Sequence, residues 1–161
     1  MAKGTPQPDA VFATNHKARR DYEILETCEV GIELKGPEIK SIRQHRVSLD
    51  GSFARVDGGE LFLYNMHVNP YEQGGRFNVE ALRVRRLLMH RREIDRLAGV
   101  LTRSRLTLVP LRLYQQHGLA KIELAVGRGK RVFEKRDRIR ERETDREIQR
   151  AIRTRQKRIS E

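Results

Sequence analysis

The sequence contains few of the residues and patterns that mark secreted, membrane-bound or metal-dependent proteins. Cys28 is the one cysteine among 161 residues, so the chain cannot form an internal disulfide or a zinc site from its own thiolates. No apolar run approaches the roughly 18 residues of a membrane-spanning helix, and no myristoylation or prenylation signal is present. Residues 1–10, with Pro6 and Pro8, lack the apolar segment of an export signal, and we expect a flexible leader there. The expected location is cytoplasmic.

Patterns that carry catalysis are missing as well. The histidines lie in separate segments, and no HExxH, CxxC or paired-carboxylate spacing occurs. His67 lies in an Asn-Met-His-Val-Asn-Pro-Tyr segment, where it could act as a metal ligand or a general base, but a loop histidine is far more often structural. We therefore expect no enzymatic activity, no cofactor and no metal site.

Positive charge is what the sequence has in excess. Lys and Arg number 34 against 22 Asp and Glu, which gives a formal net charge of +12. A chain this basic is expected to bind a polyanion. An acidic membrane surface would attract the same charge, but the missing membrane anchors favour nucleic acid.

The chain divides into a folded part and a charged tail. Residues 11–130 alternate short apolar segments with turn residues, which is typical of a packed β-domain, whereas residues 131–161 hold few apolar side chains. At the junction, Phe133 stands among cations, and a ring so placed can stack on a nucleobase while its neighbours hold phosphates. A solvated charge run after a last strand is the simpler interpretation of these residues alone.

The folded part is predicted to consist mainly of strands. Residues 22–34 indicate one long bent strand, with Gly31 at a bulge or at a close approach of another backbone. Hairpins are predicted around residues 57–59, Asp-Gly-Gly, and around residues 115–118, Gln-Gln-His-Gly. Pro110 indicates a bulge or a solvent-facing strand edge.

Short helices are predicted between the strands. One covers residues 38–45 after Pro37, and a second covers residues 91–101, where apolar residues form a helical stripe. Residues 65–78 have no apolar period and indicate a long exposed loop. A mainly β fold follows, as a small closed barrel of the oligonucleotide-binding type with short flanking helices and a basic C-terminal tail. A split β-sandwich fits the same elements nearly as well.

Glu29 is an acidic residue at the bend of the long predicted strand, in a basic domain. An ionised carboxylate only accepts hydrogen bonds, so it suits a base edge or a ribose hydroxyl, although an exposed strand carboxylate without such a role is the commoner case. Lys17 lies in the basic lead-in to this strand, and Lys40 and Arg43 fall on the outward face of the first predicted helix. These three cations are further candidates for RNA binding.

The tail, residues 131–161, has arginines at helical spacing, with acidic residues three positions before several of them. Such pairs contribute only about 0.2–0.5 kcal/mol each, against a costly helix nucleus. We therefore expect a tail that is disordered when free and helical when bound to a polyanion. A helix of this length would span roughly 40 Å, enough to enter a channel. A tail that serves only solubility is the alternative.

Several stretches, in order and at matching spacing, carry a resemblance to a known family: Glu29–Ile32, Gly36–Arg43, Gly59–Leu63, Asn69–Tyr71, Arg83–His90, Thr107–Leu111 and Gly129–Arg136. Together they resemble the small protein B family, the tmRNA-binding or SsrA-binding proteins of bacterial ribosome rescue. The resemblance covers about residues 11–143. Arg105 replaces a usual glycine of this family, and Pro37 stands where Thr or Trp is usual.

The resemblance implies a barrel that binds the tRNA-like domain of tmRNA (SsrA RNA). It also implies a tail that enters the decoding centre and the empty message channel of a stalled ribosome, against 16S rRNA. Elongation factor Tu is an implied partner that accompanies the charged tmRNA. The implied RNA-binding positions are Asn15, Glu29, Leu88, His90, Lys121, Lys130 and Arg131. The implied ribosome-binding positions are Phe133, Glu134, Lys135 and Arg136, with Ile152 as a further expected anchor.

Two other hypotheses stay open at this point. One is a ribosomal protein with a barrel and an rRNA-penetrating extension, which would reside stably on the ribosome. The other is an RNA-processing enzyme, which the missing catalytic residues disfavour.

Overall fold

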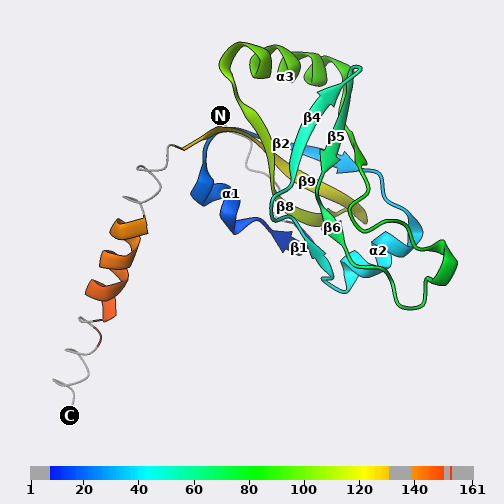
Figure 1. Ribbon diagram of the computed structural model, residues 1–161, viewed down its shortest axis with the longest axis horizontal. Coiled ribbons are helices and arrows are strands. Elements are labelled where there is room, and N and C mark those ends of the chain that lie inside the picture. Colours follow the sequence, from blue (N-terminus) through cyan, green and yellow to red (C-terminus); the bar gives the residue numbers. More distant parts are fainter. Residues whose placement is uncertain (1–7, 131–138, 151–152, 154–161) are drawn as a thin grey trace. The chain divides into compact units, whose positions relative to one another are not determined.

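The computed structural model describes residues 8–130, 139–150 and 153 (Figure 1). The chain forms two compact units, Met1–Gly129 and Lys130–Glu161. In the second unit, residues 139–150 are helical. The elements of the first unit are β1 (Ala10–Thr14), α1 (His16–Asp21), β2 (Tyr22–Ile32), α2 (Gly36–Arg43), β3 (Val47–Ser48), β4 (Phe53–Asp57), β5 (Glu60–Tyr64), β6 (His67–Val68), a 3-10 turn (Gly75–Phe77), β7 (Arg85–Leu88), α3 (Arg91–Ser104), β8 (Thr107–Gln116) and β9 (Leu119–Gly129). The predicted mainly β fold with short helices is confirmed.

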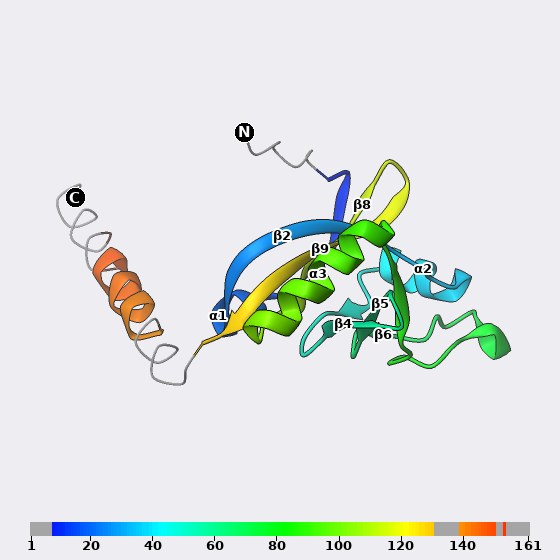
Figure 2. The same ribbon diagram turned by 90° about the horizontal axis from the view of Figure 1, so that it is seen from above.

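One antiparallel sheet organises the first unit. Its seven strands follow the order β1-β8-β4-β5-β7-β2-β9. Because β8 also pairs with β9, the pairings that lead from β8 through β4, β5, β7, β2 and β9 return to β8. Figure 2 shows β2 as a long curved strand beside β9. The curvature lets β2 pair with β9 along most of its length and with β7 at its end.

The core lies on the inward face of this sheet. In β5, Leu61 and Leu63 are fully buried, while the residues between and after them point to the other face. Burying each such leucine stabilises the fold by about 1.5–3 kcal/mol. Helix α3, which lies across one end of β4 and β5 in Figure 1, adds Ile94 and Leu97 to the same core.

Several predicted elements are present. The long bent strand is the single strand β2, and the Asp-Gly-Gly hairpin is β4–β5, with Gly58 and Gly59 at φ values of 56° and 76°. Positive φ at both turn positions is the geometry that glycine adopts without strain. Of the two alternatives predicted at Pro110, the bulge is confirmed, because the β8–β9 register shifts between Pro110 and Arg112.

Three elements differ from the prediction. Two of them, β1 and β6, are strands stabilised by partners far along the chain. β1 begins at Ala10, inside the predicted leader, and pairs with β8. β6 lies within residues 65–78, predicted as a loop, and pairs with β3. Helix α2 begins at Gly36 and ends at Arg43, two residues earlier at each end than predicted.

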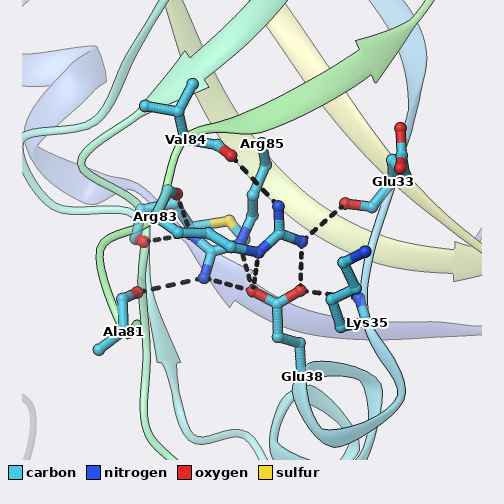
Figure 3. Close-up of polar contacts among 8 residues, drawn as sticks. Glu33, Lys35, Glu38, Ala81, Arg83, Val84 and Arg85 are labelled. Atoms are coloured by element: carbon cyan, nitrogen blue, oxygen red, sulfur yellow. Dashed lines mark hydrogen bonds and ion pairs between the residues drawn. The ribbon is translucent and has the colours of Figure 1, made fainter. Parts of the chain in front are cut away.

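A buried ion pair joins α2 to β7. The side chain of Arg85 is 0% exposed and that of Glu38 is 3% exposed. Arg85 Nε donates to Glu38 at 2.8 Å, and Arg85 Nη2 lies 2.7 Å from the same carboxylate oxygen. The remaining donors of Arg85 reach backbone carbonyls of Met66 at 2.6 Å, Arg83 at 3.0 Å and Ala81 at 3.1 Å (Figure 3). The guanidinium is therefore fully hydrogen-bonded inside the protein.

The carboxylate of Glu38 accepts hydrogen bonds from three residues. Besides Arg85, the guanidinium of Arg83 donates to both carboxylate oxygens, at 3.1 and 2.6 Å, and the backbone N–H of Lys35 donates at 2.8 Å. Burial works to raise the pKa of Glu38, but the hydrogen bonds from Arg83, Lys35 and Arg85 outweigh it, so the pKa lies below its ordinary value. The sequence analysis placed Glu38 only at the start of the helix predicted over residues 38–45. The structure shows that it also neutralises a buried arginine.

Replacing Glu38 by glutamine leaves the positive charge of Arg85 buried without its partner. We expect Glu38→Gln to lower the free energy of unfolding by about 3–5 kcal/mol, measured by urea denaturation at neutral pH. Glu72→Gln is the matched control, because Glu72 pairs with Arg46 at 3.0 Å but its side chain is 79% exposed. Its expected effect is at most about 1 kcal/mol.

The same pair predicts a pH dependence. The folded pKa of Glu38 is lowered, so its contribution is complete above the unfolded pKa and is lost as the pH falls through the folded pKa. The difference in stability between the native sequence and Glu38→Gln should therefore shrink on acidification. This role would be contradicted if the stability difference between the two proteins stayed constant as the pH falls, or if the two proteins were equally stable at neutral pH.

Candidate nucleic-acid interface

A groove of about 420 Å³ lies where β2, β7, β9 and the start of α3 meet, and we call it the β2–β9 groove. Its described lining residues come from three separate stretches of the chain, 29–31, 88–93 and 121. They include four of the implied RNA-binding positions, Glu29, Leu88, His90 and Lys121. The structure therefore brings together residues that are distant in the sequence.

Strand register explains how these residues meet. Gly31 of β2 lies opposite Leu88 of β7 on one side and opposite Lys121 of β9 on the other. Residues paired in this way point to the same face of the sheet. A Cβ atom at Gly31 would lie 3.2 Å from Cβ of Leu88, so glycine lets the leucine lean over β2. The sequence predicted a bulge or a close backbone approach at Gly31, whereas the close neighbour is the side chain of Leu88 from β7.

Glu29 lies at the centre of a small hydrogen-bonded network. The hydroxyl of Tyr114 donates to one of its carboxylate oxygens, and Nζ of Lys121 donates to the other. Burial works to raise the pKa of Glu29, but the hydrogen bonds from Lys121 and Tyr114 outweigh it and the pKa is lowered. Burial, followed by the bond to Glu29, raises the pKa of Tyr114, so the phenol keeps its proton.

This network leaves Glu29 available as an acceptor. Its side chain is 29% exposed, and an ionised carboxylate has more acceptor sites than its two bonds occupy. The bonds to Lys121 and Tyr114 fix the carboxylate in one orientation before any partner arrives. A fixed, ionised acceptor in a basic domain suits a hydroxyl or amino group of a nucleotide.

A second ion pair supports the first. Glu123 of β9 lies opposite Glu29, and two like charges in that position would repel each other. Arg112 Nε donates to Glu123 at 2.8 Å, and the Arg112 guanidinium lies 5.2 Å from the centre of the Tyr114 ring. The sequence analysis missed these three partners, Arg112, Tyr114 and Glu123.

Two of the implied contacts lie at the rim of the groove. The side chain of Leu88 is 49% exposed, which is unusual for a leucine beside a core and leaves an apolar surface for a base or sugar. The exposed His90 precedes α3, and its backbone carbonyl accepts from the N–H groups of Glu93 and Ile94 at 3.0 and 3.1 Å. No side-chain hydrogen bond from His90 caps the helix.

Asn15 has an internal position. Its side chain is 2% exposed, and its amide donates to the carbonyls of Leu49 and Pro110, both at 3.1 Å. Its carbonyl oxygen accepts from the N–H of Ala18 at 3.0 Å, which caps α1. Both amide hydrogens are therefore used within the protein. A direct RNA contact by Asn15 stays a prediction, and the geometry gives the residue a positioning role.

Of the remaining predicted positions, Lys17, Lys40 and Arg43 do not line the β2–β9 groove. Lys17 pairs with Asp50 at 2.9 Å, and the two residues line a separate groove beside α1. Lys40 lies 5.2 Å over the ring of Tyr71, and both Lys40 and Arg43 are exposed on α2. Lys130 follows the end of β9. The predicted positions outside the described residues are Arg131, Phe133, Glu134, Lys135, Arg136 and Ile152.

Two further features concern only the part of the chain that the structure describes. Within it, no helix is both long and apolar enough to cross a membrane. Also within it, no three His, Cys, Asp or Glu side chains gather closely enough to hold a metal ion.

Comparisons with known proteins agree with one another. A family model described as "SmpB protein" matches residues 12–154. The SsrA-binding protein of Geobacillus thermodenitrificans is 55% identical over 147 residues, which cover 91% of this chain and 95% of that protein. The SsrA-binding protein of Carboxydothermus hydrogenoformans is 54% identical over 147 residues, which cover 91% of this chain and 99% of that protein.

A solved structure also resembles this fold. It is described as "tmRNA-SmpB: a journey to the center of the bacterial ribosome", and it aligns with a TM-score of 0.62 at 50% sequence identity. The alignment covers 74% of this chain and 84% of that chain. The mainly β architecture with short helices is common to both.

The network around Glu29 makes a prediction about protonation. Tyr114→Phe removes one donor and Lys121→Met removes the other, so each should raise the pKa of Glu29 toward its ordinary value. The measurement is an NMR titration of the Glu29 carboxyl carbon. Tyr71→Phe is the control, since its hydroxyl donates to Gln73 at 3.1 Å on an exposed loop. An unchanged Glu29 pKa in both test variants would contradict the network.

Proposed function

The chain belongs to the SmpB protein family, and from this premise we propose that it binds tmRNA and acts with it on the ribosome in trans-translation. The β2–β9 groove is the surface that we assign to the tRNA-like domain of tmRNA. One observation carries this assignment: four implied RNA-binding positions, from three separate stretches of the chain, line the same groove.

The chemistry of the groove suits RNA. Glu29 is held ionised and oriented, so it accepts a hydrogen bond from a ribose 2′-hydroxyl or from an amino group on a base edge. Lys121, bound to Glu29 through one of its three hydrogens, has donors left for a phosphate. Leu88 offers an apolar surface against a sugar or base. A 2′-hydroxyl contact of this kind would distinguish RNA from DNA.

We propose that the sheet acts as a small closed barrel of the oligonucleotide-binding type. The support is the cycle of strand pairings that leaves β8 through β4 and returns to it through β9. Closure would hold β2, β7 and β9 in fixed positions around the groove.

The tail is assigned to the ribosome. We propose that Lys130 and Arg131 bind RNA at the exit of the folded part, and that residues 133–136 enter the decoding centre, with Ile152 as an anchor in the message channel. The helix at residues 139–150 supports a helical tail on the ribosome, and its arginines suit rRNA phosphates. Disorder of the free tail remains a prediction. The family resemblance adds elongation factor Tu as a partner that delivers charged tmRNA.

The proposed action is binding without catalysis, and it requires no cofactor. The Glu29 network supports this proposal, because Glu29 bonds to Lys121 and to the buried Tyr114 rather than to a reactive group. Since the ribosome and tmRNA are cytoplasmic, we propose the cytoplasm as the location. Lys17, Lys40 and Arg43 remain candidates for contacts with a larger RNA.

The groove assignment is tested by removing its charges. We expect Glu29→Gln combined with Lys121→Met to weaken binding of a tRNA-like tmRNA fragment by roughly 10- to 100-fold, since each lost bond involves a charged group. The measurement is fluorescence anisotropy of the labelled fragment. Sedimentation with ribosomes should remain within about twofold of the native chain, because the tail is intact.

The matched control removes an ion pair elsewhere on the same strand. Glu26→Gln with Arg96→Met makes the same charge changes at an exposed pair, 2.6 Å apart, that joins β2 to α3. Its affinity for the tmRNA fragment should not change. Equal losses in the two double variants, or equal losses of tmRNA and ribosome binding, would refute two separate surfaces.

The tail assignment predicts a separation of activities. A chain that ends at Val132 should bind the tmRNA fragment with native affinity but fail to tag peptides on stalled ribosomes. The measurement is peptide tagging in a reconstituted translation reaction. A chain without residues 1–7 is the control and should retain both activities. Tagging by the chain that ends at Val132 would exclude the proposed role of the tail.

A further inference from the structure

The outward face of the β4–β5 hairpin carries three aromatic rings, Phe53, Phe62 and Tyr64. The chain has five phenylalanines and four tyrosines, so a third of them lie on this one hairpin. All three rings are partly exposed. We call this surface, with Arg55 of β4 and Arg86 of β7, the aromatic face.

Strand alternation places the rings outward. The hairpin already supplies Leu61 and Leu63 to the core from its inward positions, so the rings are additional to core packing. Phe53 lies opposite Tyr64 in the register, and their rings stack with centroids 5.3 Å apart and planes 9° from parallel. The rings are thus held in a fixed orientation at the surface.

Arginines flank the rings. Phe62 lies opposite Arg55 on one neighbouring strand and opposite Arg86 on the other, and both arginines are exposed. The guanidinium of Arg55 also lies 6.0 Å from the centre of the Tyr64 ring. A row of Arg, Phe and Arg across three strands therefore combines flat apolar surface with positive charge.

The acidic residues of this hairpin lie toward its turn. Asp57 and Glu60 flank the Gly-Gly turn, and Glu60 pairs with Arg86 at 2.7 Å. Arg55 is farther from the turn than either carboxylate, opposite Phe62 and two residues from Phe53 of the Phe53–Tyr64 pair. The end of the face away from the turn is therefore both the more aromatic and the more cationic part.

We propose that the aromatic face binds unpaired RNA nucleotides by stacking, as a second RNA site separate from the β2–β9 groove. Exposed rings beside arginines suit single strands, because the bases stack on the rings while the guanidinium groups hold phosphates. Duplex RNA fits less well, since its bases already stack on one another. The protein would then hold a folded RNA in the β2–β9 groove and an unpaired RNA segment on the aromatic face at the same time.

The test uses the full chain and an eight-nucleotide single-stranded RNA that contains 5-iodouridine. After irradiation, mass spectrometry should locate crosslinks at Phe62 or Tyr64. Affinity is measured by anisotropy at high salt, where phosphate contacts with the basic tail are weakened but stacking is not. Phe62→Leu and Tyr64→Leu keep apolar bulk and should each weaken binding by roughly 5- to 100-fold.

The control is an aromatic residue outside the face. Phe77 lies on a loop, its side chain is 70% exposed, and Arg76 lies 5.1 Å from its ring, so it combines the same groups without the sheet. Phe77→Leu should bind the oligomer like the native chain. The Phe62→Leu and Tyr64→Leu variants could lose binding by losing stability. Arg55→Gln changes an exposed residue of the same face, and it should also weaken binding and shift the crosslinks.

Several outcomes would overturn the second site. They are crosslinks confined to the tail or the groove, an effect of Phe77→Leu as large as that of Phe62→Leu, and displacement of the oligomer by excess tmRNA fragment. The proposal would also be refuted if the aromatic face bound a protein and did not bind RNA. The role of the groove is judged separately, by the tmRNA fragment and the Glu29 and Lys121 variants, so the two proposals can fail independently.

Discussion

The buried ion pair between Arg85 and Glu38 is the contact on which both proposed RNA surfaces depend. It fixes Arg85 on the inward face of β7, in a strand of only four residues that bridges β5 and β2. Because side chains alternate along a strand, this choice turns Arg86 outward beside Phe62 and Leu88 outward over Gly31. A shift of β7 by one residue would reverse all of these positions. The register of one short strand thus sets the aromatic face and the groove together.

The groove shows how a basic protein holds an acidic residue in a fixed position. Glu29 would repel phosphates if it stood alone, but Lys121 and Tyr114 bind it and Arg112 neutralises its neighbour Glu123. Each of the two carboxylates is therefore paired with a cation, and the Glu29 carboxylate remains ionised in a set direction. Groups fixed before binding lose little freedom when the partner arrives, which favours selective contact over general attraction to phosphate.

Local patterns in the sequence predicted the elements that local chemistry determines. The turn at Gly58 and Gly59 and the apolar stripe of α3 are examples, and the hairpin turn at residues 117–118 also sets which residues of β8 and β9 face each other. β7 could not be found in this way, because an arginine at an inward position is stable only with Glu38, 47 residues away. The groove residues came from family resemblance, since their convergence depends on pairings among distant strands. An RNA contact by Asn15 is a prediction from resemblance alone, because the structure shows its amide bonded inside the protein.

The central claim is that β7, held by its buried arginine, builds a groove that receives folded RNA. The most direct measurement is an NMR chemical-shift map of the full chain during titration with the tRNA-like domain of tmRNA. The account predicts that the backbone amides of Gly31, Leu88 and Lys121 shift together at one RNA equivalent. Saturation of binding with these three amides unshifted would contradict it.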